Sequence, residues 1–237
     1  MSRLFAVIPA AGRGSRLGSA VAKQYLEIAG KSLLSWSLDA VLACEDIRVC
    51  AVALPDQHAC HTFLESVKSE RVVACVGGAC RADSVRAGIA ALGAEHRDWV
   101  LVHDAARPCL DRKDLENLVA AVRRRDIGGL LAQPVSDTLK EVSADQMVAA
   151  TVDRSSYWRA QTPQMFRVGE LSKAFDLAQD AEITDEASAM ERAGYPVQII
   201  EGSASNLKVT FAEDLELAEF WLRRSDVRSR SVSEGAV

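Results

Sequence analysis

The chain has 237 residues, of which 49% are hydrophobic and 26% charged, a composition typical of a globular protein rather than a disordered or fibrous one. Its formal net charge of -5 argues against a general nucleic-acid-binding protein, which usually presents excess basic residues to phosphates. The apolar run at residues 4–11 is far shorter than the ~18 residues of a membrane span, and a basic glycine-rich stretch follows it instead of a signal-peptide cleavage region. The six cysteines form no C-x-x-C pair, so we expect reduced thiols in a cytoplasmic protein without a membrane or nucleic-acid partner.

Short continuous apolar runs alternate with helical patterns along most of the chain. The first run is residues 4–8, and similar runs recur at 49–54, 72–76, 99–102, 129–135 and 197–201. Uninterrupted apolar runs are typical of parallel strands covered on both faces. Helical periodicity predicts helices at 32–43, 82–92, 111–125, 168–179, 185–193 and 212–222. We therefore predict an α/β fold with a single doubly wound, mostly parallel, Rossmann-like sheet.

The alternation breaks between residues 136 and 161, where the apolar pieces are too short for core strands. This pattern predicts a protruding β-arm on a single domain that spans residues 1–225. The end of the chain is rich in Ser and Arg and poor in large apolar groups, so residues 226–237 are predicted to be a disordered tail. Thr184 precedes a predicted helix and is a plausible N-cap.

A glycine-rich loop at residues 9–18 follows the first predicted strand, where such turns expose backbone N–H groups to phosphates. It does not match the dinucleotide fingerprint, because Leu17 occupies the third small position. A P-loop before Lys31 would need glycine where Tyr25 stands. What remains is a glycine loop with Arg13, Arg16 and, farther along, Lys23, a density of cations that suits a triphosphate.

The glycine loop is the first of an ordered set of motifs that resembles the 2-C-methyl-D-erythritol 4-phosphate cytidylyltransferase family. The resemblance covers residues 4–222. The matching segments are Ala10-Ala11-Gly12-x-Gly14-x-Arg16 with Lys23-Gln24-Tyr25, Gly77-Gly78-x-x-Arg81-x-x-Ser84-Val85, Val102-His103-Asp104-Ala105-Ala106-Arg107-Pro108, Asp137-Thr138, Thr151-Val152-Asp153-Arg154, Thr162-Pro163-Gln164, Thr184-Asp185-Glu186-Ala187 and Asn206-Leu207-Lys208-Val209-Thr210.

The resemblance implies transfer of a cytidylyl group from CTP to a sugar-alcohol phosphate, with release of pyrophosphate, in the non-mevalonate route to isoprenoid precursors. The chemistry is consistent with the residues present. A phosphate monoester has its second pKa near ~6, so the attacking oxygen is mostly ionised at neutral pH and needs no general base. The protein's task is then alignment and neutralisation of charge by Arg, Lys and a divalent ion.

The resemblance also implies roles for individual residues. Positions matching catalytic residues of the family are Arg16, Lys23, Arg154 and Lys208. CTP is expected to contact Ala10, Ala11, Gly12, Gly14, Gly78, Arg81, Ser84 and Ala105. The substrate side is expected to include Asp104, Arg107, Thr138, Thr162 and Thr184, and Asp104 is the expected protein ligand of Mg²⁺, the implied cofactor. A homodimer is implied as well, in which the arm carries Thr138 and Arg154 into the partner's site.

Two other functions fit parts of the same pattern. Ribitol 5-phosphate cytidylyltransferases share the nucleotide loops and differ mainly on the sugar side. A non-catalytic nucleotide-binding module would keep the cytosine pocket but has no reason to keep Arg16, Lys23, Arg154 and Lys208 together. The sequence departs from the family at Ala79-Cys80, where acidic residues are common, and at Ala22, where proline is common.

Overall fold

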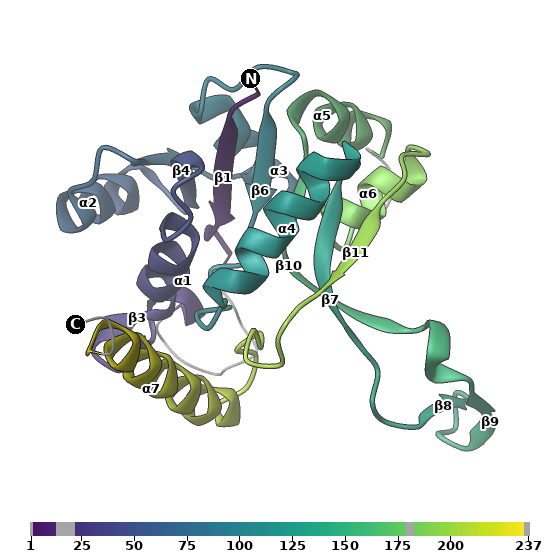
Figure 1. The fold of residues 1–237 in the computed structure, drawn as a ribbon. Coiled ribbons are helices and arrows are strands. Elements are labelled where there is room, and N and C mark those ends of the chain that lie inside the picture. Colours follow the sequence, from purple (N-terminus) through teal and green to yellow (C-terminus); the bar gives the residue numbers. More distant parts are fainter. Residues whose placement is uncertain (1, 13–21, 179–182, 235–237) are drawn as a thin grey trace.

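The computed structural model describes residues 2–12, 22–178 and 183–234. Its centre is a seven-stranded sheet in the order β11-β7-β10-β6-β1-β4-β5 (Figure 1). All neighbouring strands pair in parallel except β10, which runs antiparallel to both β6 and β7. The predicted α/β fold with one mostly parallel sheet is confirmed. The strands are β1 (Leu4–Pro9), β4 (Ile47–Leu54), β5 (Val72–Val76), β6 (Trp99–Val102), β7 (Gly129–Pro134), β10 (Trp158–Arg167) and β11 (Gln198–Glu201).

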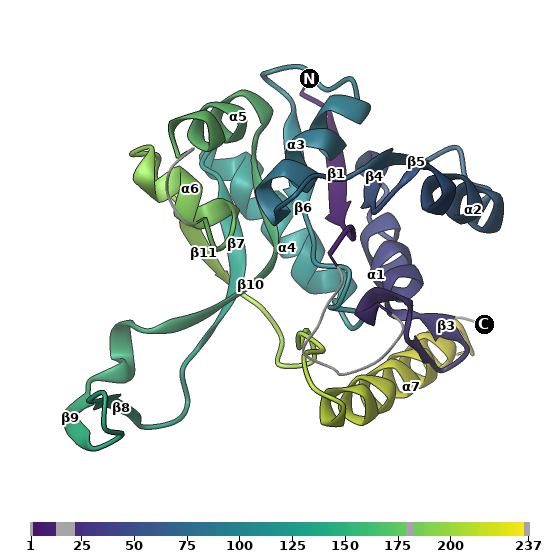
Figure 2. The same ribbon diagram turned by 180° about the vertical axis from the view of Figure 1, so that it is seen from behind.

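Helices cover both faces of this sheet (Figures 1 and 2). One face packs against α1 (Leu33–Leu42), α2 (Gln57–Val67) and α4 (Arg112–Arg125), and the other against α3 (Arg81–Ala91), α5 (Val168–Leu177) and α6 (Glu186–Arg192). Strand β1 contributes to both cores, because Leu4 and Ile8 belong to the first cluster and Val7 to the second. Because both faces of β1 are buried, its sequence is a continuous apolar run.

Strand β10 was not among the predicted strands, although it lies in the middle of the sheet. Its sequence contains Gln161, Pro163 and Gln164, and polar residues with a proline argue against a central strand. The pairing of β10 with β7 is irregular between Ala160 and Gln164, so the segment around Pro163 is not required to donate a regular ladder hydrogen bond to β7. The local sequence pattern therefore does not predict β10, which is stabilised by its pairing with β6 and β7.

The predicted arm is present as a projection from the body of the molecule (Figures 1 and 2). It ends in a small antiparallel sheet of β8 (Leu139–Val142) and β9 (Val148–Val152), followed by a short 3-10 helix η3 (Arg154–Ser156). The arm is shorter than the predicted 136–161, because residues 158–161 already belong to β10. Its large apolar side chains are exposed, among them Met147 at 65% and Val148 at 61%.

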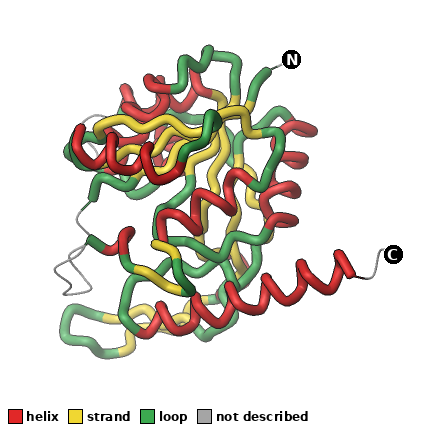
Figure 3. The backbone as a smooth tube through the Cα atoms, turned by 90° about the vertical axis from the view of Figure 1, so that its left-hand side faces the viewer, coloured by secondary structure: helices red, strands yellow, loops and turns green. Residues whose placement is uncertain are grey.

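The C-terminal helix α7 (Glu213–Glu234) is the long helix that leads to the C-terminus in Figure 3. Ala218 and Leu222 pack against Ile28 of a short hairpin, β2 (Glu27–Ile28) and β3 (Lys31–Ser32), and against Leu33. The helix continues past the predicted end at Leu222 into the region where composition predicts a disordered tail. Arg is a good helix former even where no apolar stripe marks a helix. Within the described ranges, no helix has the length and apolar character needed to cross a membrane.

Candidate active site

A cavity of about 410 Å³ opens at the carboxyl ends of β1, β5 and β6, the edge where doubly wound sheets bind ligands. It is lined by the loop after β1, the N-terminal turn of α3, the loop after β6 and Lys208. A second hollow beside it shares Arg81, Asp104 and Lys208 with the first and is completed by Arg107, β10 and the start of α6. Two compartments therefore meet at these three charged side chains.

The loop after β1 is fastened to the short 3-10 helix η2 (Lys23–Tyr25). Gln24 is buried, and its side-chain Nε2 donates to the carbonyl oxygens of Ala10 at 2.7 Å and Gly12 at 2.9 Å. The adjacent Lys23 lines the cavity with Ala10, Ala11 and Gly12. Gln24 thus fixes the loop, while Lys23 supplies the positive charge.

The loop after β5 needs glycine because it is tightly packed. A Cβ atom on Gly78 would lie 2.1 Å from the Cβ atom of Asp83, and one on Gly77 would lie 2.6 Å from that of Ala11. The Ser84 hydroxyl accepts from the Gly78 N–H at 3.2 Å and donates to the Cys80 carbonyl at 3.0 Å. These contacts hold the backbone of the loop at the wall of the cavity.

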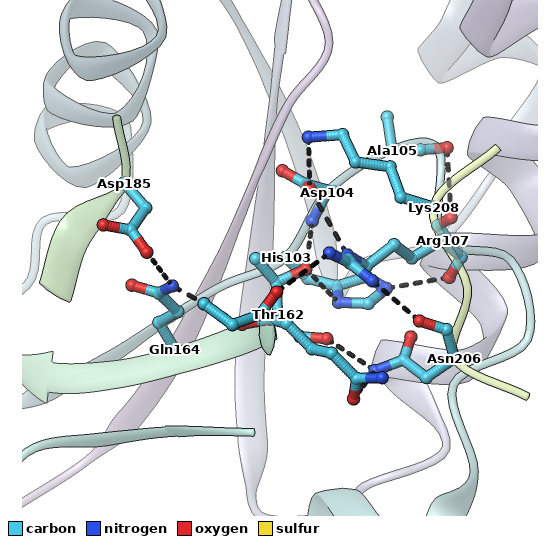
Figure 4. Close-up of polar contacts among 12 residues, drawn as sticks. His103, Asp104, Ala105, Arg107, Thr162, Gln164, Asp185, Asn206 and Lys208 are labelled. Atoms are coloured by element: carbon cyan, nitrogen blue, oxygen red, sulfur yellow. Dashed lines mark hydrogen bonds and ion pairs between the residues drawn. The ribbon is translucent and has the colours of Figure 1, made fainter. Parts of the chain in front are cut away.

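Asp104 follows β6 and is the centre of a cluster of charges (Figure 4). Its carboxylate accepts from Lys208 Nζ at 2.9 Å, Arg81 Nη2 at 3.2 Å and Arg107 Nε at 3.4 Å. Burial alone would raise the pKa of Asp104, but the three cations together hold that pKa well below its usual range. Asp104 therefore stays ionised and keeps three basic side chains gathered at the cavity.

His103 and Thr162 position the backbone of Asp104 (Figure 4). The His103 Nε2–H donates to the Arg107 carbonyl at 3.0 Å, so Nδ1 accepts from the Thr162 hydroxyl at 3.1 Å. The Thr162 oxygen in turn accepts from the Asp104 N–H at 2.9 Å. Burial lowers the pKa of His103 to about 4, which keeps the imidazole neutral in this chain of hydrogen bonds.

The neutral His103 predicts a loss of stability in mild acid. The unfolded chain binds a proton near pH 6.5 and the folded chain only near pH 4, so stability is full above pH 6.5 and falls as the pH drops between these values. Between pH 7 and pH 5 this residue should cost about 2 kcal/mol of the free energy of unfolding. Urea unfolding at both pH values should show the loss in wild type and not in His103→Gln.

His58 supplies the matched control for that experiment, because it is exposed on α2. The His58→Gln variant is expected to keep the wild-type dependence of stability on pH. If His103→Gln loses as much stability as wild type between pH 7 and pH 5, the assignment of this dependence to His103 is wrong.

The start of α6 is tied to β10 through Gln164. Gln164 Nε2 donates to Asp185 Oδ2 at 2.8 Å, and Gln164 Oε1 accepts from the Ala187 N–H at 2.8 Å. The N-cap of α6 is Asp185, whose carboxylate accepts from the Ser188 N–H. The suggestion that Thr184 caps this helix is therefore wrong by one residue, and Thr184 instead lines the second hollow.

The cavity brings together most of the residues singled out from the sequence. Those that line the first compartment are Ala10, Ala11, Gly12, Lys23, Gly78, Arg81, Ser84, Asp104, Ala105 and Lys208, and those that line the second include Arg107, Thr162 and Thr184. Gly14 and Arg16 lie outside the described residues. Thr138 and Arg154 are exposed on the arm and line neither compartment of their own chain.

Several further residues of the site carried no signal of their own in the sequence. Gln24 and Gln164 act through backbone contacts, and Glu186 binds Arg81 from α6. Asn206 Nδ2 donates to the Thr162 backbone carbonyl at 2.8 Å, while the backbone carbonyl of Asn206 accepts from Arg107 Nη1 at 2.7 Å. All four lie inside the matched motifs, so their types could be read from the chain but their partners could not.

The comparisons with known proteins agree with this geometry. The profile of a family described as 2-C-methyl-D-erythritol 4-phosphate cytidylyltransferase matches residues 4–224. A protein of that name from Chromobacterium violaceum is 47% identical over 223 residues, 94% of this chain and 99% of its own. The chain belongs to this family. Its members include the Francisella tularensis protein, whose structure matches with a TM-score of 0.78 at 33% identity and covers 93% of this chain and 100% of that one. A crystal structure of 4-diphosphocytidyl-2C-methyl-D-erythritol synthase matches with a TM-score of 0.80 at 37% identity, covering 94% and 99%.

The two departures from the cytidylyltransferase family have local structural explanations. Ala22 has a φ of -61°, close to the value that a proline ring would impose, so the loop adopts this geometry without the proline. Cys80 is the N-cap of α3 and accepts from the Asp83 N–H at 3.4 Å, while Asp83 completes a capping box. Cys80 therefore takes the capping role that an acidic residue would have at this position.

Proposed function

We propose that this chain transfers the cytidylyl group of CTP to 2-C-methyl-D-erythritol 4-phosphate and releases pyrophosphate. The observation that carries the proposal is the cavity itself, in which a glycine loop and backbone of small residues lie beside Lys23, Arg81 and Lys208. A site of this kind suits a nucleoside triphosphate, whose negative charges need both backbone donors and cations. The name shared by the relatives supplies the identity of the acceptor.

The reaction needs no general base from the protein. The acceptor phosphate is mostly ionised at neutral pH and can attack the α-phosphate of CTP directly. His103 is the histidine next to the cavity, and both of its ring nitrogens are already engaged by Arg107 and Thr162. The remaining contribution is electrostatic, with Arg16 and Lys23 stabilising the transition state and Lys208 and Arg154 holding the sugar phosphate.

Asp104 is proposed as the single protein ligand for Mg²⁺, which would take the place of one of the cations that its carboxylate now holds. Its carboxylate is ionised and lies in the cavity, whereas no group of three or more His, Cys, Asp or Glu side chains gathers around a possible metal position among the described residues. Mg²⁺ commonly keeps waters and substrate phosphate oxygens and takes only one or two carboxylates. The bound ion would neutralise charge on the triphosphate during transfer.

The arm is proposed to complete the site of a second copy of the chain. Arg154 and Thr138 lie on the arm, away from both compartments of their own chain. The exposed apolar side chains of the arm give it a surface suited to burial in an interface, and they are Val142, Met147, Val148 and Tyr157. A homodimer with shared sites explains both observations.

Cytoplasmic placement is part of the same proposal. All six cysteines are thiols without a disulfide partner, and Cys44, Cys50 and Cys109 are buried. Thiols of this kind suit a reducing compartment, where they act as small apolar residues.

The proposal is tested by measuring pyrophosphate release with CTP and Mg²⁺. We expect turnover with 2-C-methyl-D-erythritol 4-phosphate and none with ribitol 5-phosphate, and UTP in place of CTP serves as a control for the nucleotide. Turnover with ribitol 5-phosphate alone would keep the chemistry and change the acceptor. If the folded protein binds CTP but releases no pyrophosphate with either acceptor, it is a non-catalytic nucleotide-binding module.

A further inference from the structure

Glu186 is the first residue of α6 and is completely buried beside the candidate active site. Its Oε1 atom accepts a hydrogen bond from Arg81 Nη1, across a sequence separation of 105 residues. Its Oε2 atom is also buried and has no hydrogen-bond partner within the described part of the chain. Burying a carboxylate with one oxygen unpartnered opposes folding, so a residue of this kind calls for a reason other than packing.

Arg81 is held by two carboxylates at once. Its Nε and Nη2 atoms donate to Asp104 Oδ1 at 3.4 and 3.2 Å, while Nη1 donates to Glu186. Burial would lower the pKa of Arg81, but the two carboxylates raise it, so the guanidinium remains charged. A guanidinium has five N–H donors in a fixed plane, and these bonds use three of them. The plane of the guanidinium is therefore fixed while donors remain for a ligand.

Arg81 lies where a fixed guanidinium can contact a ligand in the cavity. Arg81 is the first residue of α3 and lines both compartments of the cavity. Asp104 holds Arg81 through Oδ1 and pairs with Lys208 and Arg107 through Oδ2, so one carboxylate serves three cations. Glu186 supplies a second anchor from another element. The neighbouring Asp185 cannot take this part, because its carboxylate caps α6 and accepts from Gln164.

We propose that Glu186 is a positioning residue of the nucleotide site, which together with Asp104 orients the Arg81 guanidinium toward bound CTP. The inference rests on the proposed function, since CTP is the ligand. Glu186 itself does not line either compartment and acts through Arg81. Its effect should therefore fall on CTP binding more than on the chemical step.

The test is CTP affinity measured by calorimetry with Mg²⁺ and without acceptor, using the full chain. Glu186→Gln is expected to weaken CTP binding about tenfold, the scale for one charge-assisted hydrogen bond. In steady state, the KM for CTP should rise by a similar factor, with kcat and the KM of the acceptor nearly unchanged. Glu191→Gln, an exposed carboxylate on the same helix, should bind CTP like wild type.

A double-mutant cycle separates positioning from a merely structural role. In an Arg81→Ala background, Glu186→Gln should cause no further loss of CTP affinity, because the group through which Glu186 acts is gone. Independent, additive losses would overturn the inference. Arg81→Lys offers a second route that leaves Glu186 in place: it retains the charge but not the planar fork, and it should also weaken CTP binding.

Failure of the inference and failure of the proposed function are distinguishable. If wild type binds CTP and either Glu186→Gln or Arg81→Lys binds it equally well, the inference is wrong and the function stands. If folded wild type binds no CTP, the proposed function is wrong and the inference falls with it.

Discussion

Lys23→Ala is expected to lower kcat by about 10²–10³-fold while leaving the fold intact, the effect of removing one donor that acts in the transition state. Lys23 begins η2 and lines the cavity beside the glycine loop. The anchor of that loop is the neighbouring Gln24, which holds the carbonyls of Ala10 and Gly12. Loss of the Lys23 side chain therefore removes charge from the cavity, while the bonds from Gln24 to Ala10 and Gly12 remain.

The measurement is steady-state pyrophosphate release with CTP and the acceptor, accompanied by a thermal unfolding curve for each variant. Lys173→Ala is a suitable control, because Lys173 is exposed on α5 and lines neither compartment. The control should retain wild-type kcat. A Lys23→Ala enzyme with near-normal kcat would show that Lys23 has no part in the chemical step.

The sequence predicts the position of this cavity because the signals are local. Glycine loops and charged residues directly after apolar runs identified the carboxyl ends of β1, β5 and β6, where the cavity is found. The order of strands was not needed, since a parallel sheet places all of these ends at one edge. Gly78 shows the limit of this reasoning. The sequence indicates a tight loop, but it does not show that the Asp83 side chain excludes a Cβ atom at position 78.

The elements that the sequence did not predict depend on distant partners. β10 carries polar residues, yet β6 and β7 on either side give it a place in the centre of the sheet. The Gln164 side chain on this strand forms hydrogen bonds with Asp185 and Ala187 at the start of α6. Similarly, nothing in the spacing of Arg81 and Glu186 predicts their contact, because α3 and α6 are brought together by packing on one face of the sheet.

In the proposed homodimer, the arm residues belong to a site that one chain cannot complete. Arg154 begins η3 and its Nη1 atom donates to the Ser136 carbonyl, within the base of the arm. The body of the same chain holds Lys23 and Lys208 in its cavity. A site that needs all three cations therefore requires the arm of another copy.

Mixing two inactive variants should restore activity if the sites are shared. In a heterodimer of Arg154→Ala and Lys23→Ala chains, one site combines an intact Lys23 with an intact Arg154 from the partner, and the other site carries both defects. Random exchange at equal concentrations makes half of the dimers heterodimers, so about a quarter of wild-type activity should return. Pyrophosphate release after subunit exchange measures this recovery.

The matched control is a mixture of Lys23→Ala with Lys208→Ala. These two residues line the same cavity of one chain, so each site in that heterodimer keeps one defect and no activity should return. Exchange itself is verified by separating dimers that carry two different affinity tags. Heterodimers of Arg154→Ala and Lys23→Ala that form and remain inactive would place Arg154 outside the partner's site. Recovery of activity in that mixture, with no recovery in the control mixture, would assign Arg154 to catalysis across the interface.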